Sequence, residues 1–138
     1  MRGFMLRSIS GLMVLALGVL MTTAPTLAAQ TATPAPQRHI VVFKFKAGAT
    51  DAQIREVTDA FVALKTKIPG IVSLEHGVNN SPEKRNQGFT HVYQVTFTSA
   101  AARDAYLPHP AHKAFGELLG RLGVLESVFV VDYVPVRD

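Results

Sequence analysis

Three segments of the chain alternate in the period-two pattern of β-strands, and a fourth segment that also predicts a strand is apolar on both faces apart from Asp132. The segments span residues 39–46, 71–78, 90–97 and 125–134. In the first and third segments, one face is especially rich in apolar and aromatic side chains, so we expect helices to cover it. The residues on that face are His39, Val41, Phe43, Phe45, His91, Tyr93, Val95 and Phe97.

Apolar residues recur at helical spacing after the first predicted strand. Thr50 and Gln53 fit a capping box, in which each side chain bonds the backbone of the other residue. Pro69 and Gly70 end the predicted helix, because proline cannot continue the backbone hydrogen bonds and glycine permits the turn. The apolar stripe of this helix consists of Ile54, Val57, Phe61, Leu64 and Ile68.

A broken helix is predicted between the third and fourth strands. Ser99 is suited to cap a short helix over residues 100–107, on which Arg103 and Asp104 are expected to point outward. Pro108 stops this helix, because the residue before a proline is driven out of helical geometry. Pro110 then opens a second helical piece, whose apolar stripe and closing glycine are Phe115, Leu118, Leu119, Leu122 and Gly123.

The order strand, helix, strand, strand, helix, strand predicts an α+β, ferredoxin-like protomer. Its four-stranded antiparallel sheet is expected to carry the helices on one face. Right-handed crossovers are expected to make the first and third strands parallel neighbours at the centre of the sheet. His39 and His91 stand near the starts of these strands, so we expect them to lie close together.

The opposite face of the predicted sheet has no cover in a monomer. It carries Ile40, Val42, Ile71, Val92 and one phase of the last strand. An apolar surface on the order of several hundred Å² is more than a soluble monomer usually exposes. A second copy packed sheet against sheet by twofold symmetry is the simplest cover, so we expect a homodimer.

Residues 1–29 have the features of a secretory signal peptide. Two arginines precede an uncharged apolar run over residues 9–21, which is too short to span a membrane, and cleavage is expected after Ala28 or Ala29. Residues 30–38 are predicted to form a flexible linker and residues 39–138 a single domain. The protein is therefore expected to be periplasmic or secreted and to meet the membrane only during export.

Composition narrows the classes of function. The chain has 138 residues, no cysteine and a formal charge of +4, so disulfides and thiolate chemistry are excluded. Arg2 and Arg7 would leave with the signal peptide, and the remaining Lys and Arg residues are scattered, so no nucleic-acid binding is expected. The sequence has no phosphate-binding glycine loop, nucleophile elbow or paired carboxylates, which argues against nucleotide binding, serine hydrolysis and glycosidase chemistry.

Several motifs of the domain resemble the stress-responsive A/B barrel (Dabb) family. They are R-H-I-V-V-F-K-F-K, I-P-G-I, G-V-N-N-S-P-E, F-T-H-V-Y-Q-V-T-F and Y-L-P-H-P-A-H-K-A-F, and the resemblance covers residues 39–135. It implies a ferredoxin-like protomer that pairs into a dimeric α/β barrel. Members of this family include stress-associated proteins and polyketide-cyclase-type enzymes, and related dimeric barrels include cofactor-free monooxygenases.

The resemblance also implies roles for individual residues. In cyclase-like members, a histidine of the H-P-x-H motif acts as the base and a nearby tyrosine orients it or the substrate, which corresponds to His112 and Tyr106. Pocket histidines at the strand starts correspond to His39 and His91. On the first helix, a tyrosine of the cyclase pattern is replaced by Phe61, which cannot hydrogen-bond a polar substrate. All five side chains are expected to line the ligand pocket.

The chemistry of these residues supports two functional hypotheses. His112 is a sensible general base because an imidazole titrates near neutrality, and the Tyr106 hydroxyl is suited to stabilise an enolate. The domain is therefore expected to bind a small hydrophobic or aromatic ligand, or to be a cofactor-free enzyme that uses His112 as its base.

Two alternatives concern the H-P-x-H motif itself. His109 and Pro110 are equally suited to shape the break in the helix, with His112 bonded to the backbone. His109 and His112 also have the spacing to share one helix face, but the motif contains no Cys, Asp or Glu, so we expect no metal site and no cofactor.

Overall fold

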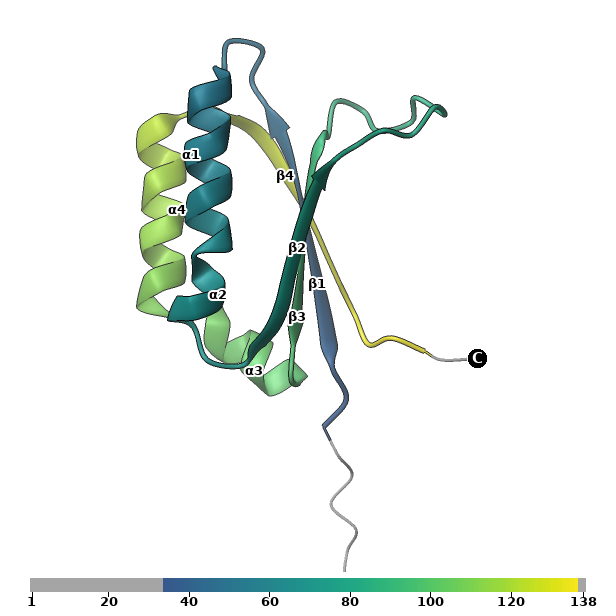
Figure 1. The fold of residues 1–138 in the computed structure, drawn as a ribbon, viewed down its shortest axis with the longest axis vertical. Coiled ribbons are helices and arrows are strands. Elements are labelled where there is room, and N and C mark those ends of the chain that lie inside the picture. Colours follow the sequence, from purple (N-terminus) through teal and green to yellow (C-terminus); the bar gives the residue numbers. More distant parts are fainter. Residues whose placement is uncertain (1–33, 137–138) are drawn as a thin grey trace, which may run out of the picture. The chain divides into compact units, whose positions relative to one another are not determined.

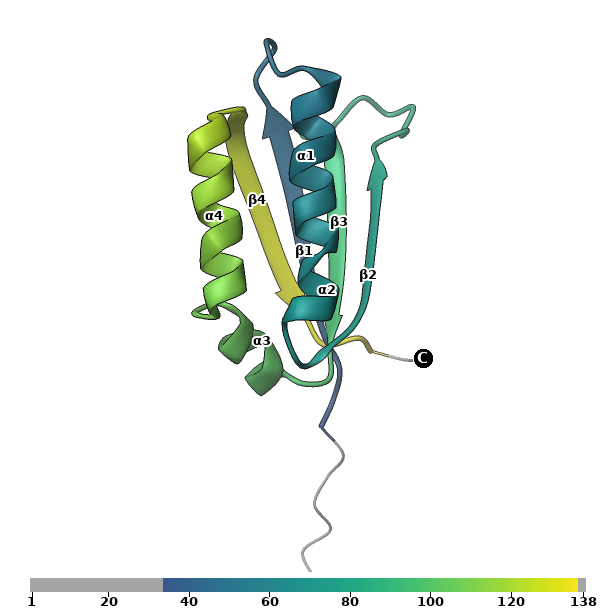
Figure 2. The same ribbon diagram turned by 60° about the vertical axis from the view of Figure 1, so that its left-hand side comes forward.

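The computed structural model describes residues 34–136, which form a four-stranded sheet with all helices on one side (Figures 1 and 2). The elements are β1 (Gln37–Phe45), α1 (Asp51–Val62), α2 (Leu64–Lys67), β2 (Ile71–Val78), β3 (His91–Phe97), α3 (Ala100–Tyr106), α4 (Pro110–Leu122) and β4 (Leu125–Tyr133). This confirms the predicted α+β, ferredoxin-like order. The predicted signal peptide lies outside the described residues, and β1 begins two residues inside the predicted linker. None of the described helices is long and apolar enough to cross a membrane.

The sheet has the strand order β2-β3-β1-β4, and every neighbouring pair is antiparallel. The expectation that the first and third strands run parallel is therefore wrong. Each helical crossover joins two parallel strands, but the hairpin between β2 and β3 reverses the chain, so β3 must run against β1. His39 pairs with Val95, whereas His91 pairs with Phe43. The two histidines consequently lie toward opposite ends of the strand pair.

The local signals at the helix ends are confirmed. Thr50 and Gln53 form both hydrogen bonds of the capping box at the start of α1. The Ser99 hydroxyl accepts a hydrogen bond from the Ala102 amide at the start of α3. Gly123 ends α4 in the left-handed conformation, with a φ of 60°, as glycine does most readily. Short-range hydrogen bonding thus sets where these helices begin and end.

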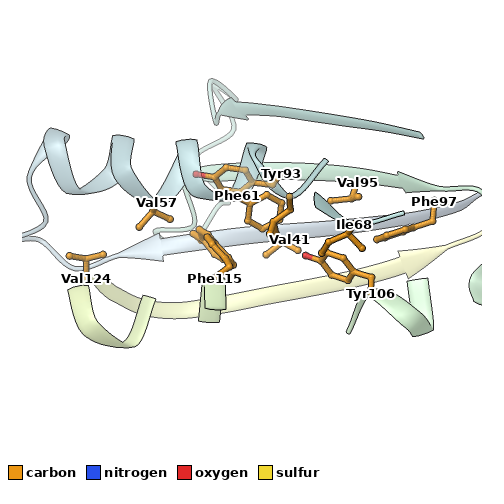
Figure 3. Packing of buried hydrophobic residues seen from close by; sticks show 12 residues of the cluster. Val41, Val57, Phe61, Ile68, Tyr93, Val95, Phe97, Tyr106, Phe115 and Val124 are labelled. Atoms are coloured by element: carbon orange, nitrogen blue, oxygen red, sulfur yellow. The ribbon is translucent and has the colours of Figure 1, made fainter. Parts of the chain in front are cut away.

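Aromatic rings fill the space between the helices and the sheet (Figure 3). Phe61 of α1 stacks on Tyr93 of β3, with ring centroids 4.6 Å apart, and meets Phe115 of α4 edge-on at 5.0 Å. Phe43 of β1 lies 5.1 Å from Tyr93 and is 1% exposed. Burying a side chain of this size stabilises the fold by about 1.5–3 kcal/mol. Four elements are therefore held together around the part of the core that borders the candidate site.

The far side of the sheet carries an uncovered apolar surface. On this side Val42 pairs with Val92 and Phe129, and Ile40 pairs with Val131. Phe129 and Val131 are 53% and 40% exposed. We call Ile40, Val42, Val92, Phe129, Val131 and Tyr133 the open face.

Ile71 does not belong to the open face, where the sequence placed it. The register shifts between Ile71 and Ser73, so that Ile71 lies opposite Phe97 and packs against the core. Val72, the extra residue, is 55% exposed. A bulge of this kind moves a side chain from one face of a sheet to the other, and strict alternation in the sequence does not reveal it.

Candidate functional site

A cavity of about 240 Å³ lies between the sheet and the helices. Its walls come from β1, β4, α1, the end of α3 and α4. Four residues predicted to line the pocket border it: His39, Phe61, Tyr106 and His112. The other lining residues are apolar or glycine: Val41, Phe43, Leu107, Phe115, Gly116, Leu119, Val128 and Val130. The site is thus an apolar chamber with three polar side chains.

His91 does not line this cavity, so the expectation of three imidazoles around one chamber is wrong. Because β3 runs against β1, His91 lies beside Phe43 and Phe45, with its ring 4.9 Å from that of Phe45. Its Nδ1 is 2.9 Å from the Thr90 hydroxyl. Burial lowers the pKa of His91, and the nearby His76 contributes to the same shift. The chamber is left with two imidazoles and one phenol.

His112 presents a basic nitrogen because of the way the helix breaks. Its Nδ1 lies 3.0 Å from the backbone carbonyl of Leu107. A carbonyl only accepts, so Nδ1 carries the proton and, in the neutral ring, Nε2 keeps its lone pair. The Leu107 carbonyl is available because the amide of Ala111, its partner in a continuous helix, bonds His109 instead. The bond to the backbone and a role as base are therefore compatible.

His109 has a structural role at this break. It is the N-cap of α4, and its Nδ1 accepts a hydrogen bond of 3.1 Å from the Ala111 amide. Pro110 follows in the first turn, where its missing N–H costs nothing. The alternative that His109 and Pro110 shape the helix break is therefore confirmed.

Tyr106 places a buried aromatic ring beside both cavity histidines. The residue is 1% exposed, and its ring centroid lies 4.3 Å from that of His112 and 5.7 Å from that of His39. Among the described residues, its hydroxyl has no hydrogen-bond partner. Burial raises the pKa of Tyr106 well above its ordinary value of 10.0, so the phenol stays protonated and can donate. A buried polar group without a partner is uncommon in folded proteins and suggests a ligand-binding role.

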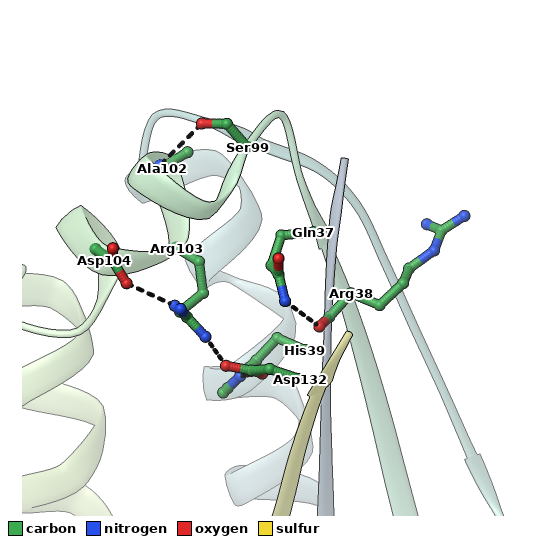
Figure 4. Close-up of polar contacts among 8 residues, drawn as sticks. All are labelled: Gln37, Arg38, His39, Ser99, Ala102, Arg103, Asp104 and Asp132. Carbon is green, nitrogen blue, oxygen red and sulfur yellow. Dashed lines mark hydrogen bonds and ion pairs between the residues drawn. The ribbon is translucent and has the colours of Figure 1, made fainter. Parts of the chain in front are cut away.

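His39 is the second cavity base, and a carboxylate holds it (Figure 4). Its Nδ1 lies 2.6 Å from Oδ1 of Asp132 on β4, and Arg103 of α3 pairs with Oδ2 of the same carboxylate. Burial, followed by the positive charge of Arg103 and then by His112, lowers the pKa of His39 to about 4. His39 is therefore neutral at pH 7, donates from Nδ1 and keeps its lone pair on Nε2.

Asp132 and Arg103 were not among the predicted site residues. Asp132 carried a signal, because it is the one charged residue in the apolar run from Val128 to Val134. The sequence contained no signal for Arg103. The expectation that its side chain points outward is wrong. Its side chain is 20% exposed and turns toward the end of β4. Which helix residue meets a strand end depends on tertiary packing, not on helical periodicity.

No three His, Asp or Glu side chains within residues 34–136 are grouped so that they could hold a metal ion. The arrangement that remains is suited to proton transfer. The imidazoles of His39 and His112 offer ring nitrogens, and a protonated phenol lies between them in an apolar chamber.

Residues 38–135 match the family described as the stress responsive A/B barrel domain. The stress-response A/B barrel domain-containing protein HS1 of Arabidopsis thaliana is 34% identical over 100 residues, which cover 72% of this chain and 90% of HS1. The olivetolic acid cyclase of Cannabis sativa is 33% identical over 98 residues, which cover 71% of this chain and 95% of the cyclase.

Two solved structures have the same fold. The hydroxynitrile lyase from Passiflora edulis aligns with a TM-score of 0.68 at 26% identity, over 76% of this chain and 97% of the lyase. A dimeric ferredoxin-like protein of unknown function from Jannaschia sp. aligns with a TM-score of 0.61 at 27% identity, over 71% of this chain and 97% of that chain.

Proposed function

The chain belongs to the stress responsive A/B barrel domain family, and we propose that it binds a small hydrophobic or aromatic carbonyl compound and removes a proton from it. The ligand occupies the cavity of about 240 Å³ between the sheet and the helices. His112 acts as the general base and Tyr106 binds the carbonyl oxygen of the ligand.

The observation that carries this proposal is the tautomer of the neutral His112 ring. The Leu107 carbonyl fixes its proton on Nδ1, so that Nε2 is available in the chamber as a base. Removal of a proton next to a carbonyl places negative charge on the carbonyl oxygen. The buried hydroxyl of Tyr106 is a donor for that charge, and the low polarity of the chamber strengthens the resulting hydrogen bond.

The lining of the cavity supports the choice of ligand class. No Lys, Arg, Asp or Glu side chain borders the chamber, so a neutral ligand is favoured over an ionised one. The aromatic rings of Phe43, Phe61 and Phe115 suit an aromatic or otherwise apolar body. Two relatives, one named a cyclase and the other a lyase, are enzymes by name, which favours turnover.

The test follows the proton directly. Aryl methyl ketones are incubated with the full mature protein in D₂O, and deuterium at the carbon next to the carbonyl is measured by mass spectrometry. The proposal requires exchange above the buffer rate for at least one ketone, and that exchange must depend on His112. If none of the ketones that bind shows such exchange, catalysis of this type is contradicted.

A second candidate function is ligand binding without turnover, and Phe61 favours it. A phenyl ring at this position of α1 gives the ligand a contact surface but no hydrogen bond. The same ketones then bind with a dissociation constant that calorimetry measures, while deuterium exchange stays at the buffer rate. Binding without exchange therefore supports this candidate.

We propose that the protein is a homodimer that packs through the open face. Phe129 and Tyr133 are 53% and 45% exposed there, and the structurally similar Jannaschia protein is described as dimeric. Replacing Phe129 by aspartate is expected to weaken the dimer by roughly a hundredfold, because a carboxylate would be buried without a partner. Light scattering at micromolar concentration should show the mass of two chains for the native protein and of one chain for the variant.

The matched control for this prediction is Val62→Asp, which introduces the same charge on the exposed side of α1. It should leave the mass at two chains. A native protein of single-chain mass, or the same dissociation in both variants, contradicts a dimer through the open face.

We also propose that the protein is exported, with residues 1–29 acting as its signal peptide. Intact-mass measurement of the protein secreted by a bacterial host should give a chain that begins at Ala29 or Gln30. A secreted or cell-associated chain that keeps Met1 contradicts this prediction. The features that support it are the basic start, the short apolar run and the small residues that follow.

A further inference from the structure

Arg103, Asp132 and His39 form a chain of polar contacts that leads from the surface to the cavity (Figure 4). Arg103 bonds Asp104 through Nε at 2.9 Å and pairs with Asp132 through Nη1. Asp132 in turn accepts from His39 at 2.6 Å. The side chain of Asp104 at the surface is 65% exposed, those of Arg103 and Asp132 are 20% and 25% exposed, and that of His39 at the cavity is 7% exposed.

We propose that Arg103 is a positioning residue that holds the Asp132 carboxylate against His39 and keeps the His39 ring neutral, with its lone pair on Nε2. The inference rests on the proposed function, because a neutral ring can accept a proton from a ligand and a protonated ring cannot. Arg103 itself does not border the cavity. It acts on the ligand only through Asp132 and His39.

The net charge of Arg103, Asp132 and His39 matters because all three side chains are largely buried. With Arg103 present, the positive guanidinium and the negative carboxylate balance, and a neutral His39 leaves the group without net charge. A proton on His39 would add an uncompensated positive charge next to Arg103. Without Arg103 the balance reverses, because the carboxylate alone favours a protonated imidazole 2.6 Å away. Arg103 therefore decides whether the proton resides on His39.

The other groups around His39 do not supply this control. Among the described residues, those that face it and can carry charge are Asp132 on β4, Arg103 and Tyr106 on α3, and His112 on α4. Tyr106 is protonated, and His112 disfavours a second positive charge only when it is itself protonated. On β3, the register partner Val95 and the ring neighbour Phe97 carry no charge.

Asp104 gives the guanidinium a second anchor. Its bond to Nε leaves Nη1 directed at Asp132, so the planar fork of arginine spans both carboxylates. Asp104 is largely exposed, so water screens its charge and it does not cancel the effect of Arg103 on His39.

The test is the titration of His39 in the full mature protein with Arg103→Gln, followed by NMR of the imidazole carbon and nitrogen resonances. The pKa of His39 is expected to rise from about 4 to at least its ordinary value of 6.5, which is more than a hundredfold change in proton affinity. The imidazole ¹⁵N shifts should show a protonated ring at pH 6 in the variant and the Nδ1–H neutral form in the native protein.

In two further variants, the His39 ring is expected to stay neutral, in contrast to the Arg103→Gln protein. Asp132→Asn removes the negative charge, so His39 should remain neutral across pH 5–8. The double variant Arg103→Gln, Asp132→Asn restores the charge balance and should also keep the ring neutral. If the Arg103→Gln protein does not fold, the Asp132→Asn prediction still stands, and a protonated His39 at neutral pH in that variant contradicts the proposal.

The control is Arg121→Gln, which removes the same charge near the other end of α4. It should leave the titration of His39 as in the native protein. The proposal is overturned if His39 does not titrate above pH 5 in Arg103→Gln, or if Arg121→Gln shifts it equally. These measurements need no ligand, so they remain decisive even if no ketone is turned over. A purely structural role of Arg103 would lower the melting temperature without moving the His39 titration.

Discussion

Replacing His112 by alanine is expected to lower the rate of deuterium exchange into a ketone ligand by about 10²–10⁴-fold. The variant loses the Nε2 lone pair that the Leu107 carbonyl makes available in the chamber. His39 is a second imidazole on the same cavity, but its pKa, lowered to about 4, makes it a weak acceptor of a proton at pH 7. Exchange rates measured at pH 7 with saturating ketone provide the comparison.

A matched control for this prediction is His76→Ala. His76 is an exposed histidine of β2 that does not border the cavity. This variant should exchange the ketone at the native rate, and both variants should keep the native circular dichroism spectrum. Equal losses in the two variants, or native exchange in His112→Ala, would rule out His112 as the base.

Replacing Tyr106 by phenylalanine is expected to affect stability and activity in opposite directions. The hydroxyl is buried, and no described residue satisfies it, so its removal should raise the free energy of unfolding by about 1–3 kcal/mol. The same change removes the donor for the developing oxyanion, so exchange should fall by about 10²-fold or more. Urea unfolding and the deuterium assay on one preparation measure both effects.

Tyr93 provides the matched control for the stability effect. It is as deeply buried as Tyr106, at 1% exposure, but its hydroxyl lies 2.7 Å from that of Thr58. Tyr93→Phe breaks this hydrogen bond and should destabilise the protein by about 0.5–1.5 kcal/mol. If both variants lose stability, the Tyr106 hydroxyl is already hydrogen-bonded in the ligand-free protein. The expectation that it stays unpaired until a ligand binds is then contradicted.

The opposite effects of Tyr106→Phe on stability and on exchange reflect a general feature of binding sites. A fold that only had to be stable would fill the chamber and satisfy or remove the Tyr106 hydroxyl. The aromatic packing of Phe43, Phe61 and Phe115 supplies the stability that tolerates the unsatisfied hydroxyl nearby.

The elements of this protein follow from local sequence. Alternation places Phe43 and Tyr93 on a helix-covered face, and Thr50, Ser99 and Gly123 mark helix ends by hydrogen bonds within a few residues. The H-P-x-H motif likewise predicts the broken helix. The cavity position of His112 and Tyr106 was also expected from the sequence, through the resemblance to known proteins.

Tertiary structure alone decides which distant residues meet. His91 looked equivalent to His39 because both stand near the start of a strand, but the direction of β3 separates them. Asp132 reaches His39 across 93 positions of the chain, and Arg103 reaches Asp132 from a helix face that periodicity assigned to solvent. Period and capping are properties of neighbours in sequence, whereas strand direction, register and helix docking depend on the whole chain. The sequence by itself therefore determined the elements and indicated His112 and Tyr106 as cavity residues, and the tertiary structure determined that Asp132 and Arg103 meet at His39.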